Sequence, residues 1–206
     1  MNKQSGKLFV FAAPSGAGKT TLVRALLAKH SELWFSISYT TRTPRKNEID
    51  GVDYLFIGKE EFMDLRDRGN LLEYAEVFDN YYATSRDRVE AYLRDGRNVI
   101  LEIDWQGARQ VRVSMPECVT IFIMPPTLGE LERRLRDRRT DSDDVIVRRL
   151  RDALSDMSHW DEFDHVIIND ELDEAVASLE SVLDGSSSSS STTNASLRDA
   201  VMRIIG

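Results

Sequence analysis

One stretch near the N-terminus decides the fold: Leu8-Phe9-Val10-Phe11-Ala12-Ala13-Pro14-Ser15-Gly16-Ala17-Gly18-Lys19-Thr20. Its first five residues are all apolar, which predicts a buried strand, and the spacing of Leu22, Ala25 and Leu26 after it predicts a helix. A strand, a glycine-containing loop and a helix that starts with Lys-Thr form the context that a phosphate-binding loop requires. We therefore expect this stretch to bind a phosphate group at a helix N-terminus.

The residues of this loop have separate expected roles. Gly16 and Gly18 let consecutive backbone N–H groups converge on one anion, and Lys19 can reach the β- and γ-phosphates of a triphosphate. The Thr20 hydroxyl can ligate Mg²⁺. Ala13 stands where the motif has its first glycine, and alanine fits there if its φ stays negative. The alternative is a glycine-rich turn that binds nothing, which would not require Lys-Thr. The predicted triphosphate-binding residues are Ala13, Pro14, Ser15, Gly16, Ala17, Gly18, Lys19, Thr20 and Thr21.

Composition narrows the class of protein further. The chain has 206 residues and a net charge of −8, which argues against nucleic acid as its main partner. Cys118 is its one cysteine, so it has neither an intramolecular disulfide nor a cysteine-based metal site. No apolar run approaches the roughly 18 residues of a membrane span. The apolar run after Lys7 is too short for a signal peptide. We expect a cytoplasmic protein without a membrane partner, and the sequence leaves the oligomeric state open.

Strand-like and helical patterns alternate along the chain, which predicts an α/β fold. The apolar runs that begin at 8, 99, 119 and 165 predict parallel strands covered on both faces. Short runs rich in Tyr, Thr and Gly over 36–85 predict a small mixed insert. The Ser-rich stretch 186–194 predicts a flexible linker, followed by a tail with helical apolar spacing. Strands are expected at 8–12, 34–38, 71–77, 98–103, 119–124 and 165–168, and helices at 20–30, 59–68, 85–95, 127–138, 143–160 and 172–183.

Five further motifs follow the loop in a fixed order: Ser38-Tyr39-Thr40-Thr41-Arg42-Thr43-Pro44-Arg45, Gly51-Val52-Asp53-Tyr54, Leu72-Glu73, Asn80-Tyr81-Tyr82-Ala83-Thr84-Ser85-Arg86 and Ile103-Asp104-Trp105-Gln106-Gly107. With the loop, they resemble the guanylate kinase family, whose members phosphorylate GMP with ATP. The resemblance runs from about residue 7 to about residue 183. It implies a P-loop NTPase core with a parallel sheet flanked by helices, a small mixed α/β GMP-binding insert and a helical lid. The implied core covers 1–35, 86–126 and 159–185, the insert 36–85, the lid 127–158, and the linker and tail 186–206.

Two arginines around Pro44 point to a phosphate pocket in this insert. Extended backbone there can aim Arg42 and Arg45 at one anion, and arginine forks match phosphate oxygens bidentately. The resemblance implies that these two arginines hold the GMP phosphate together with Tyr54 and Tyr82. From the residues alone, an exposed basic loop and tyrosines packed in the core are the alternatives.

One glutamate is the candidate for recognising the base. Guanine presents two donors, N1–H and the N2 amino group, and one carboxylate can accept from both. Glu73 follows two apolar residues and is expected to emerge from a strand into a pocket. The resemblance makes it the guanine reader, with hydroxyls from Ser38 and Thr84. A solvated strand-end glutamate is the alternative.

Glu102 and Asp104 lie two residues apart at the end of a predicted strand, so they share a side. Ligands gather at the carboxyl ends of strands in α/β sheets, and two acids there suit Mg²⁺, its waters and a nucleotide edge. The resemblance adds both residues to the GMP-binding set, although the family usually has aspartate where Glu102 stands. Helix capping by Asp104 is the alternative.

A second basic cluster is expected to form the lid. Arg134 and Arg138 are four residues apart on one predicted helix, and Arg149 belongs to the next. The resemblance assigns these three to stabilising the transferring phosphoryl group, beside Lys19 and Arg42, and a solvated charged helix face is the alternative. Asp137 and Arg139 replace glycines that the family has around Arg138. Asn169 resembles the family's contact on the adenine side.

The function implied by the resemblance is ATP-dependent phosphorylation of GMP to GDP with Mg²⁺. ATP and GMP are then the expected partners. Two other functions stay open: a non-catalytic guanylate-kinase-like interaction module, and a kinase for another small phosphorylated molecule. The phosphate loop argues against the first, because such modules lack it. The set of Glu73, Ser38 and Thr84 argues against the second.

Overall fold

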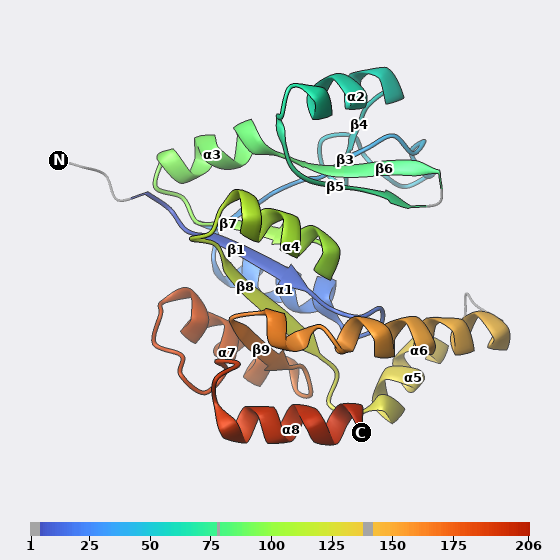
Figure 1. The fold of residues 1–206 in the computed structure, drawn as a ribbon, viewed down its shortest axis with the longest axis vertical. Coiled ribbons are helices and arrows are strands. Elements are labelled where there is room, and N and C mark those ends of the chain that lie inside the picture. The colour runs from blue at the N-terminus through green and yellow to red at the C-terminus, as the bar shows by residue number, and fades with distance from the viewer. Residues whose placement is uncertain (1–4, 78, 138–141) are drawn as a thin grey trace. The chain divides into compact units, whose positions relative to one another are not determined.

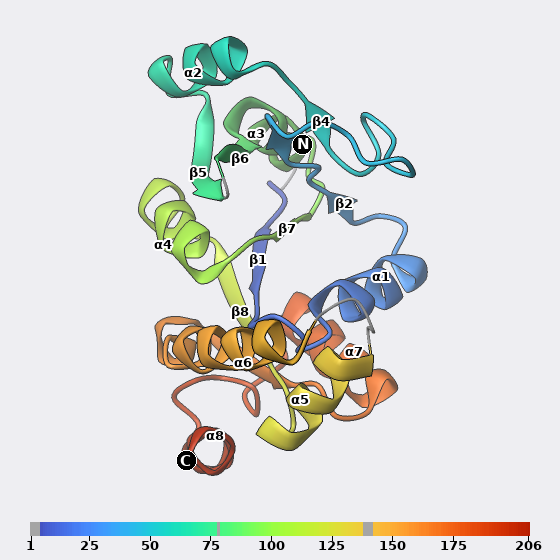
Figure 2. The same cartoon turned by 90° about the vertical axis from the view of Figure 1, so that its right-hand side faces the viewer.

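The computed structural model describes residues 5–77, 79–137 and 142–206. The described chain divides into two compact units. The first holds the described residues within Met1–Leu8, Glu32–Leu101 and Gln106–Cys118. The second holds those within Phe9–Ser31, Glu102–Trp105 and Val119–Gly206. Figure 1 labels most of the helices and strands of both units, and Figure 2 labels β2 (Trp34–Phe35).

The second unit is built on parallel strands. β8 (Val119–Met124) pairs in parallel with β1 (Leu8–Ala12) on one side and with β9 (His165–Ile168) on the other. Every residue of β1 and all but the first of β8 are buried, which confirms the prediction of strands covered on both faces. The helices of this unit are α1 (Lys19–Lys29), α5 (Leu128–Asp137), α6 (Asp143–Met157), α7 (Leu172–Leu183) and α8 (Ala195–Ile205), with a 3₁₀ turn at Trp160–Glu162.

The first unit contains a parallel pair and a separate mixed sheet. β2 (Trp34–Phe35) pairs in parallel with β7 (Val99–Glu102). The mixed sheet has the order β4-β3-β6-β5, formed by Leu55–Phe56, Tyr39–Thr40, Asn80–Ser85 and Leu71–Val77. Its helices are α2 (Lys59–Asp67), α3 (Arg86–Arg94) and α4 (Trp105–Ser114).

Helix α2 closes the core of the mixed sheet. Phe62 is fully buried and stacks on Tyr81, with ring centroids 4.9 Å apart. Leu71 and Ala83 complete the same cluster. Burial of these side chains anchors β5 and β6, the strands that carry Glu73 and Thr84.

The predicted α/β fold with parallel strands and flanking helices is confirmed. The bounds predicted for β1, β5, β8 and β9 agree with the structure. The strand expected at 34–38 covers only Trp34–Phe35, and the helix expected at 143–160 ends at Met157. The sequence patterns do not predict β3, β4, β6 or α4. Of these, β3 and β4 have two residues each, which is too short for a period of two to show.

The prediction of a flexible linker at the Ser-rich stretch is wrong, because residues of this stretch are hydrogen-bonded and buried. The Val166 N–H donates to the Ser190 carbonyl at 2.8 Å, and Thr192 Oγ1 donates to the Phe163 carbonyl at 2.7 Å. Both Ser190 and Thr192 are buried. The stretch therefore runs along β9 as a bonded strap. Composition cannot reveal this, because serine hydroxyls bond to water and to protein groups equally well.

Helix α8 packs on the second unit of the same chain and lies below α6 in both views (Figure 1 and Figure 2). Asn194 caps it by accepting from the Leu197 N–H at 3.1 Å. Val201 is fully buried, and the Arg198 guanidinium lies 4.9 Å from the centroid of the Trp160 ring. The apolar side of this tail thus belongs to the fold of the chain itself.

Val201 and Met202 are neighbours on α8, one buried and one exposed, so substitutions at the two positions test this packing. Val201→Ala should lower the free energy of unfolding by roughly 1–3 kcal/mol, because it opens a cavity under α8. Met202→Ala changes the next residue, which is 53% exposed, and should stay within about 0.5 kcal/mol of the parent. Urea denaturation measures both. Equal effects of the two changes would show that α8 is not packed in this way.

Candidate functional site

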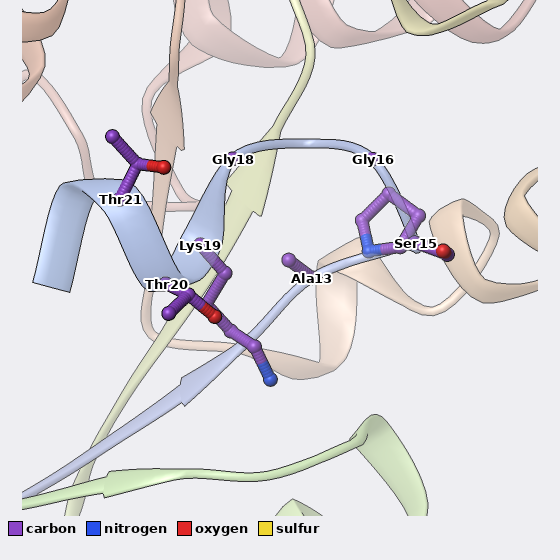
Figure 3. Close-up of a pocket in the computed structure, with 8 residues that line it drawn as sticks. Ala13, Ser15, Gly16, Gly18, Lys19, Thr20 and Thr21 are labelled. Atoms are coloured by element: carbon purple, nitrogen blue, oxygen red, sulfur yellow. The ribbon is translucent and has the colours of Figure 1, made fainter. Parts of the chain in front are cut away.

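The loop between β1 and α1 has the bent backbone that an anion site needs. Gly16 and Gly18 have φ values of 94° and 89°, in the left-handed region that favours glycine. Among the described residues, Asp79 is the one non-glycine with a positive φ. The expected negative φ of Ala13 is therefore confirmed. The loop and the first turn of α1 line a cavity of about 300 Å³, shown in Figure 3.

Two side chains of α1 extend to the same side of this loop. Figure 3 shows Lys19 and Thr20 on that side, whereas Thr21 extends away. Lys19 Nζ donates to the Ile103 carbonyl at 2.6 Å, and Thr20 Oγ1 donates to a Glu102 carboxylate oxygen. The structure thus brings together the predicted lysine, the predicted metal ligand and the acid at the end of β7.

Burial lowers the pKa of the Lys19 ammonium below its ordinary value of 10.5. The carboxylates of Glu102, Asp104 and Asp156 oppose this shift by attracting the ammonium. A buried ammonium is attracted more strongly by an added anion than an exposed ammonium is, because less water screens the two charges. Asp156 is a neighbour that the sequence analysis misses, because it lies on α6, far away in the chain.

The outer side of the loop is held by two polar side chains. Asn169 is buried, and its Nδ2 donates to the Ala17 carbonyl at 2.8 Å. Arg134 contacts the same carbonyl at 3.4 Å and the Asn169 carbonyl at 3.1 Å. In a trans peptide the C=O and the following N–H point in opposite directions. Turning the Ala17 carbonyl toward Asn169 therefore turns the Gly18 N–H to the opposite side.

The predicted lid arginines have different positions. Arg134 is fixed on α5 by Glu130, whose carboxylate oxygen lies 2.7 Å from Arg134 Nε. Hydrogen bonds from Arg133 and Arg134 hold the pKa of Glu130 at about 2, so the carboxylate stays charged. Arg149 is a half-buried residue of α6. The predicted residue Arg138 lies outside the described residues, as does Arg139.

The first unit brings together three of the side chains predicted for a phosphate. Arg42 Nε donates to the Tyr82 hydroxyl at 3.2 Å, and the Arg42 guanidinium lies 5.5 Å from the Tyr54 ring centroid. Arg45 is exposed on the same loop. These residues share one unit, as the resemblance implies for a common ligand.

In the structure, the Arg42 guanidinium is bonded to an acid of its own loop. Its Nη1 and Nη2 donate to the Glu48 carboxylate at 3.0 and 2.8 Å, and Nη1 also donates to the Thr43 carbonyl at 2.9 Å. With the bond to Tyr82, four of its five N–H donors have protein acceptors. The pair raises the pKa of Arg42 and lowers that of Glu48. Glu48 also accepts from the Arg45 N–H at 2.8 Å.

The sequence analysis misses Glu48. The available signal was an acid six residues after Arg42 in the same loop. Its carboxylate occupies the fork in the way that a phosphate would, so the loop is already ordered around a negative charge.

The candidate guanine reader is buried rather than solvated. Glu73 is 6% exposed, and Thr84 Oγ1 donates to its carboxylate at 2.6 Å. Ser38 is half-buried in the same unit. A buried carboxylate needs hydrogen-bond donors, and a ligand with paired N–H groups would supply them.

The residues predicted for GMP are divided between the two units, and only Glu102 and Asp104 of that set share a unit with the phosphate loop. The loop residues, Glu102, Asp104 and Asn169 belong to the second unit, and Ser38, Arg42, Glu73 and Thr84 belong to the first. Asp104 is exposed after β7. Among the residues described, no group of three or more His, Cys, Asp or Glu side chains could hold a metal ion, and no helix is long and apolar enough to cross a membrane.

A strand, a loop bent at two glycines and a helix that starts with Lys-Thr define a P-loop nucleotide-binding protein of the α/β class. The family model described as Guanylate kinase matches residues 5–186. The chain therefore belongs to the guanylate kinase family.

Similar proteins agree with this family. The chain is 54% identical over 178 residues to guanylate kinase from Aromatoleum aromaticum, covering 86% of this chain and 87% of that relative. It is 51% identical over 177 residues to guanylate kinase from Alkalilimnicola ehrlichii, with the same coverage. The crystal structure of guanylate kinase from Anaplasma phagocytophilum matches with a TM-score of 0.71 and 33% identity, over 98% of this chain and 96% of that one.

The loop geometry predicts a strong effect of one methyl group. A Cβ added to Gly18 would lie 2.5 Å from Asn169 Nδ2, and the left-handed conformation alone costs such a residue about 1–2 kcal/mol. Gly18→Ala should therefore lower both the melting temperature and the affinity for a nucleoside triphosphate, measured by calorimetry.

The control is Gly129→Ala on α5, where the nearest atom within 4 Å of an added Cβ is Thr127 Oγ1 at 3.9 Å. That change should leave triphosphate affinity unchanged. If the two variants bind the triphosphate equally well, the loop does not depend on Gly18.

Proposed function

We propose that this chain transfers the γ-phosphoryl group of ATP to GMP, producing ADP and GDP. The observation that carries the proposal is the buried Glu73–Thr84 pair in a chain that also has a complete phosphate loop. The Glu73 carboxylate, fixed by a hydrogen bond from the Thr84 hydroxyl, can accept hydrogen bonds from the N1–H and N2 amino groups of guanine. The loop matches a triphosphate. The family supports the same pair of substrates.

On the ATP side, the protein supplies position and positive charge, which is most of what phosphoryl transfer asks of it. The loop N–H groups would bind the phosphate oxygens, and Lys19 would neutralise them in a poorly hydrated place. Arg134 and Asn169 hold the loop from behind, and Asn169 would also face the adenine side. In the proposed lid over 127–158, Arg134, Arg138 and Arg149 would stabilise the transferring group.

Magnesium fits the residues present. Thr20 Oγ1 and the Glu102 carboxylate are hard oxygen donors already joined by a hydrogen bond, and Mg²⁺ prefers such donors together with phosphate oxygens and waters. When bound with ATP, it supplies further neutralisation of the phosphates. Glu102 would therefore serve the metal as well as GMP.

On the GMP side, Arg42, Arg45, Tyr54 and Tyr82 would hold the 5′-phosphate. Because the Arg42 fork contacts Glu48, the incoming phosphate competes with that carboxylate for the guanidinium. Glu73, Thr84 and Ser38 would hold the base, and Asp104 is also in the proposed GMP-binding set. The GMP phosphate is itself an anionic nucleophile, so no strong general base is required. The insert over 36–85 would therefore set the choice of acceptor.

An ADP-release assay with GMP, AMP, CMP and UMP as acceptors tests the proposal. The expected result is fast release with GMP alone, dependent on Mg²⁺. Equal rates with another monophosphate, or release that no acceptor stimulates, would overturn it.

Base choice depends on Glu73. Glu73→Gln should raise KM for GMP strongly, because the amide offers a donor where guanine also has donors. Adenine has an acceptor at N1, so the preference for GMP over AMP should narrow. Sites built on such pairing reject a wrong partner by on the order of 10⁴–10⁵. Steady-state kinetics with both nucleotides measure the change.

In the same variant, KM for ATP should stay close to that of the parent, because the phosphate loop is untouched. A Glu73→Gln variant that keeps the parent's selectivity would show that another group reads the base.

A further inference from the structure

The strand that carries Glu73 is irregular at the residue just before it. β5 is the outer strand of the β4-β3-β6-β5 sheet and pairs on one side with β6. Leu71 lies opposite Ser85, and Glu73 lies opposite Thr84, so Leu72 is an extra residue on β5. Such a β-bulge re-aims side chains but interrupts the ladder of hydrogen bonds. On its own, an outer strand with a bulge holds a side chain loosely.

Helix α4 replaces the missing neighbour of this strand. The Tyr74 N–H donates to Gln110 Oε1 at 3.1 Å, and Gln110 Nε2 donates to the Tyr74 carbonyl at 3.0 Å. The carboxamide therefore bonds Tyr74 as the next strand of a sheet would. Ser114, one turn further along α4, donates to the Leu72 carbonyl at 3.3 Å. Residues four apart share a helix face, so both act from one side.

These bonds fix the two peptide planes on either side of Glu73. The Leu72 carbonyl belongs to the peptide that precedes the Glu73 Cα, and the Tyr74 N–H belongs to the peptide that follows it. Because peptides are planar, the direction of the Glu73 side chain is set by the φ and ψ between these two planes. Holding both planes limits both angles. At the other end, Thr84 holds the carboxylate at 2.6 Å.

We propose that Gln110, with help from Ser114, is a positioning residue for base selection: it clamps the backbone on both sides of Glu73 and so fixes its carboxylate. The inference rests on the proposed role of Glu73. A carboxylate that accepts from N1–H and the N2 amino group together must lie in the plane of the base. A small rotation of β5 would keep the contact with N1–H and lose the contact with the N2 amino group. The clamp is therefore needed most for the contact with the N2 amino group.

The test compares Gln110→Leu with Gln106→Leu. Both replace a glutamine of α4 with leucine, and Gln106 is exposed one turn earlier on the helix. The readout is the ratio of kcat/KM for GMP to that for IMP, which lacks only the N2 amino group. Gln110→Leu should lower this ratio about tenfold, the scale of one or two neutral hydrogen bonds. The Tyr74 amide should also exchange its hydrogen faster, and KM for ATP should not change.

Gln106→Leu should match the parent in all three readouts. Ser114→Ala should lower the ratio less than Gln110→Leu, and it keeps the clamp testable if Gln110→Leu folds poorly. In a Glu73→Gln background, Gln110→Leu should lower the ratio no further, because the group that it positions is already changed.

Two results would overturn the clamp, and one of them would also reject Glu73 as the guanine reader. If Glu73→Gln lowers the GMP-to-IMP ratio but neither Gln110→Leu nor Ser114→Ala does, the clamp is wrong and the proposed function stands. If Glu73→Gln leaves the ratio unchanged, the proposed guanine reader is wrong and the clamp fails with it.

Discussion

The hydrogen bond from Asn169 Nδ2 to the Ala17 carbonyl is the constraint on which the phosphate loop depends. It turns one peptide of the loop outward, and so sets the direction of the following N–H. Gly18 must follow because a Cβ there would meet the same Nδ2 at 2.5 Å. Arg134 reinforces the bond from α5. One buried carboxamide thus determines a backbone conformation, a required glycine and the place where α1 presents Lys19.

Charged groups in both units are held by partners of the kind that a nucleotide would supply. The Arg42 guanidinium donates hydrogen bonds to the Glu48 carboxylate, and the Glu73 carboxylate accepts one from the Thr84 hydroxyl. The Lys19 ammonium is attracted by neighbouring carboxylates. Each partner fixes a side chain in place, so less conformational entropy is lost when a ligand binds. In the proposed reaction, binding exchanges these internal partners for phosphate and base. The clamp that Gln110 forms on β5 extends the same principle from side chains to backbone.

Short-range patterns in the sequence predicted much of the fold and of the candidate site. The loop, the buried strands β1, β8 and β9, and the buried acid Glu73 follow from residues close together in the chain. The contacts of Asn169, Asp156 and Gln110 do not, because each joins segments far apart in sequence. The prediction of a flexible linker at the Ser-rich stretch was wrong for a similar reason, because the hydrogen-bond partners of that stretch lie on β9 and just before it. Sequence patterns indicate which residue types can bind a ligand, whereas the residues that hold them in place depend on tertiary contacts.

The most direct test of the account is calorimetric titration of ATP and, separately, of GMP into the chain and into Lys19→Ala. In the proposed reaction the phosphate loop holds the triphosphate, whereas Arg42 and Glu73 of the other unit hold the phosphate and the base of GMP. Lys19→Ala should therefore weaken ATP binding at least about tenfold, the scale of a lost charge-assisted contact, and leave GMP binding unchanged. Lys29→Ala, at the exposed end of the same helix, should change neither. Unchanged ATP affinity in Lys19→Ala, or an equal loss of GMP affinity, would contradict the account.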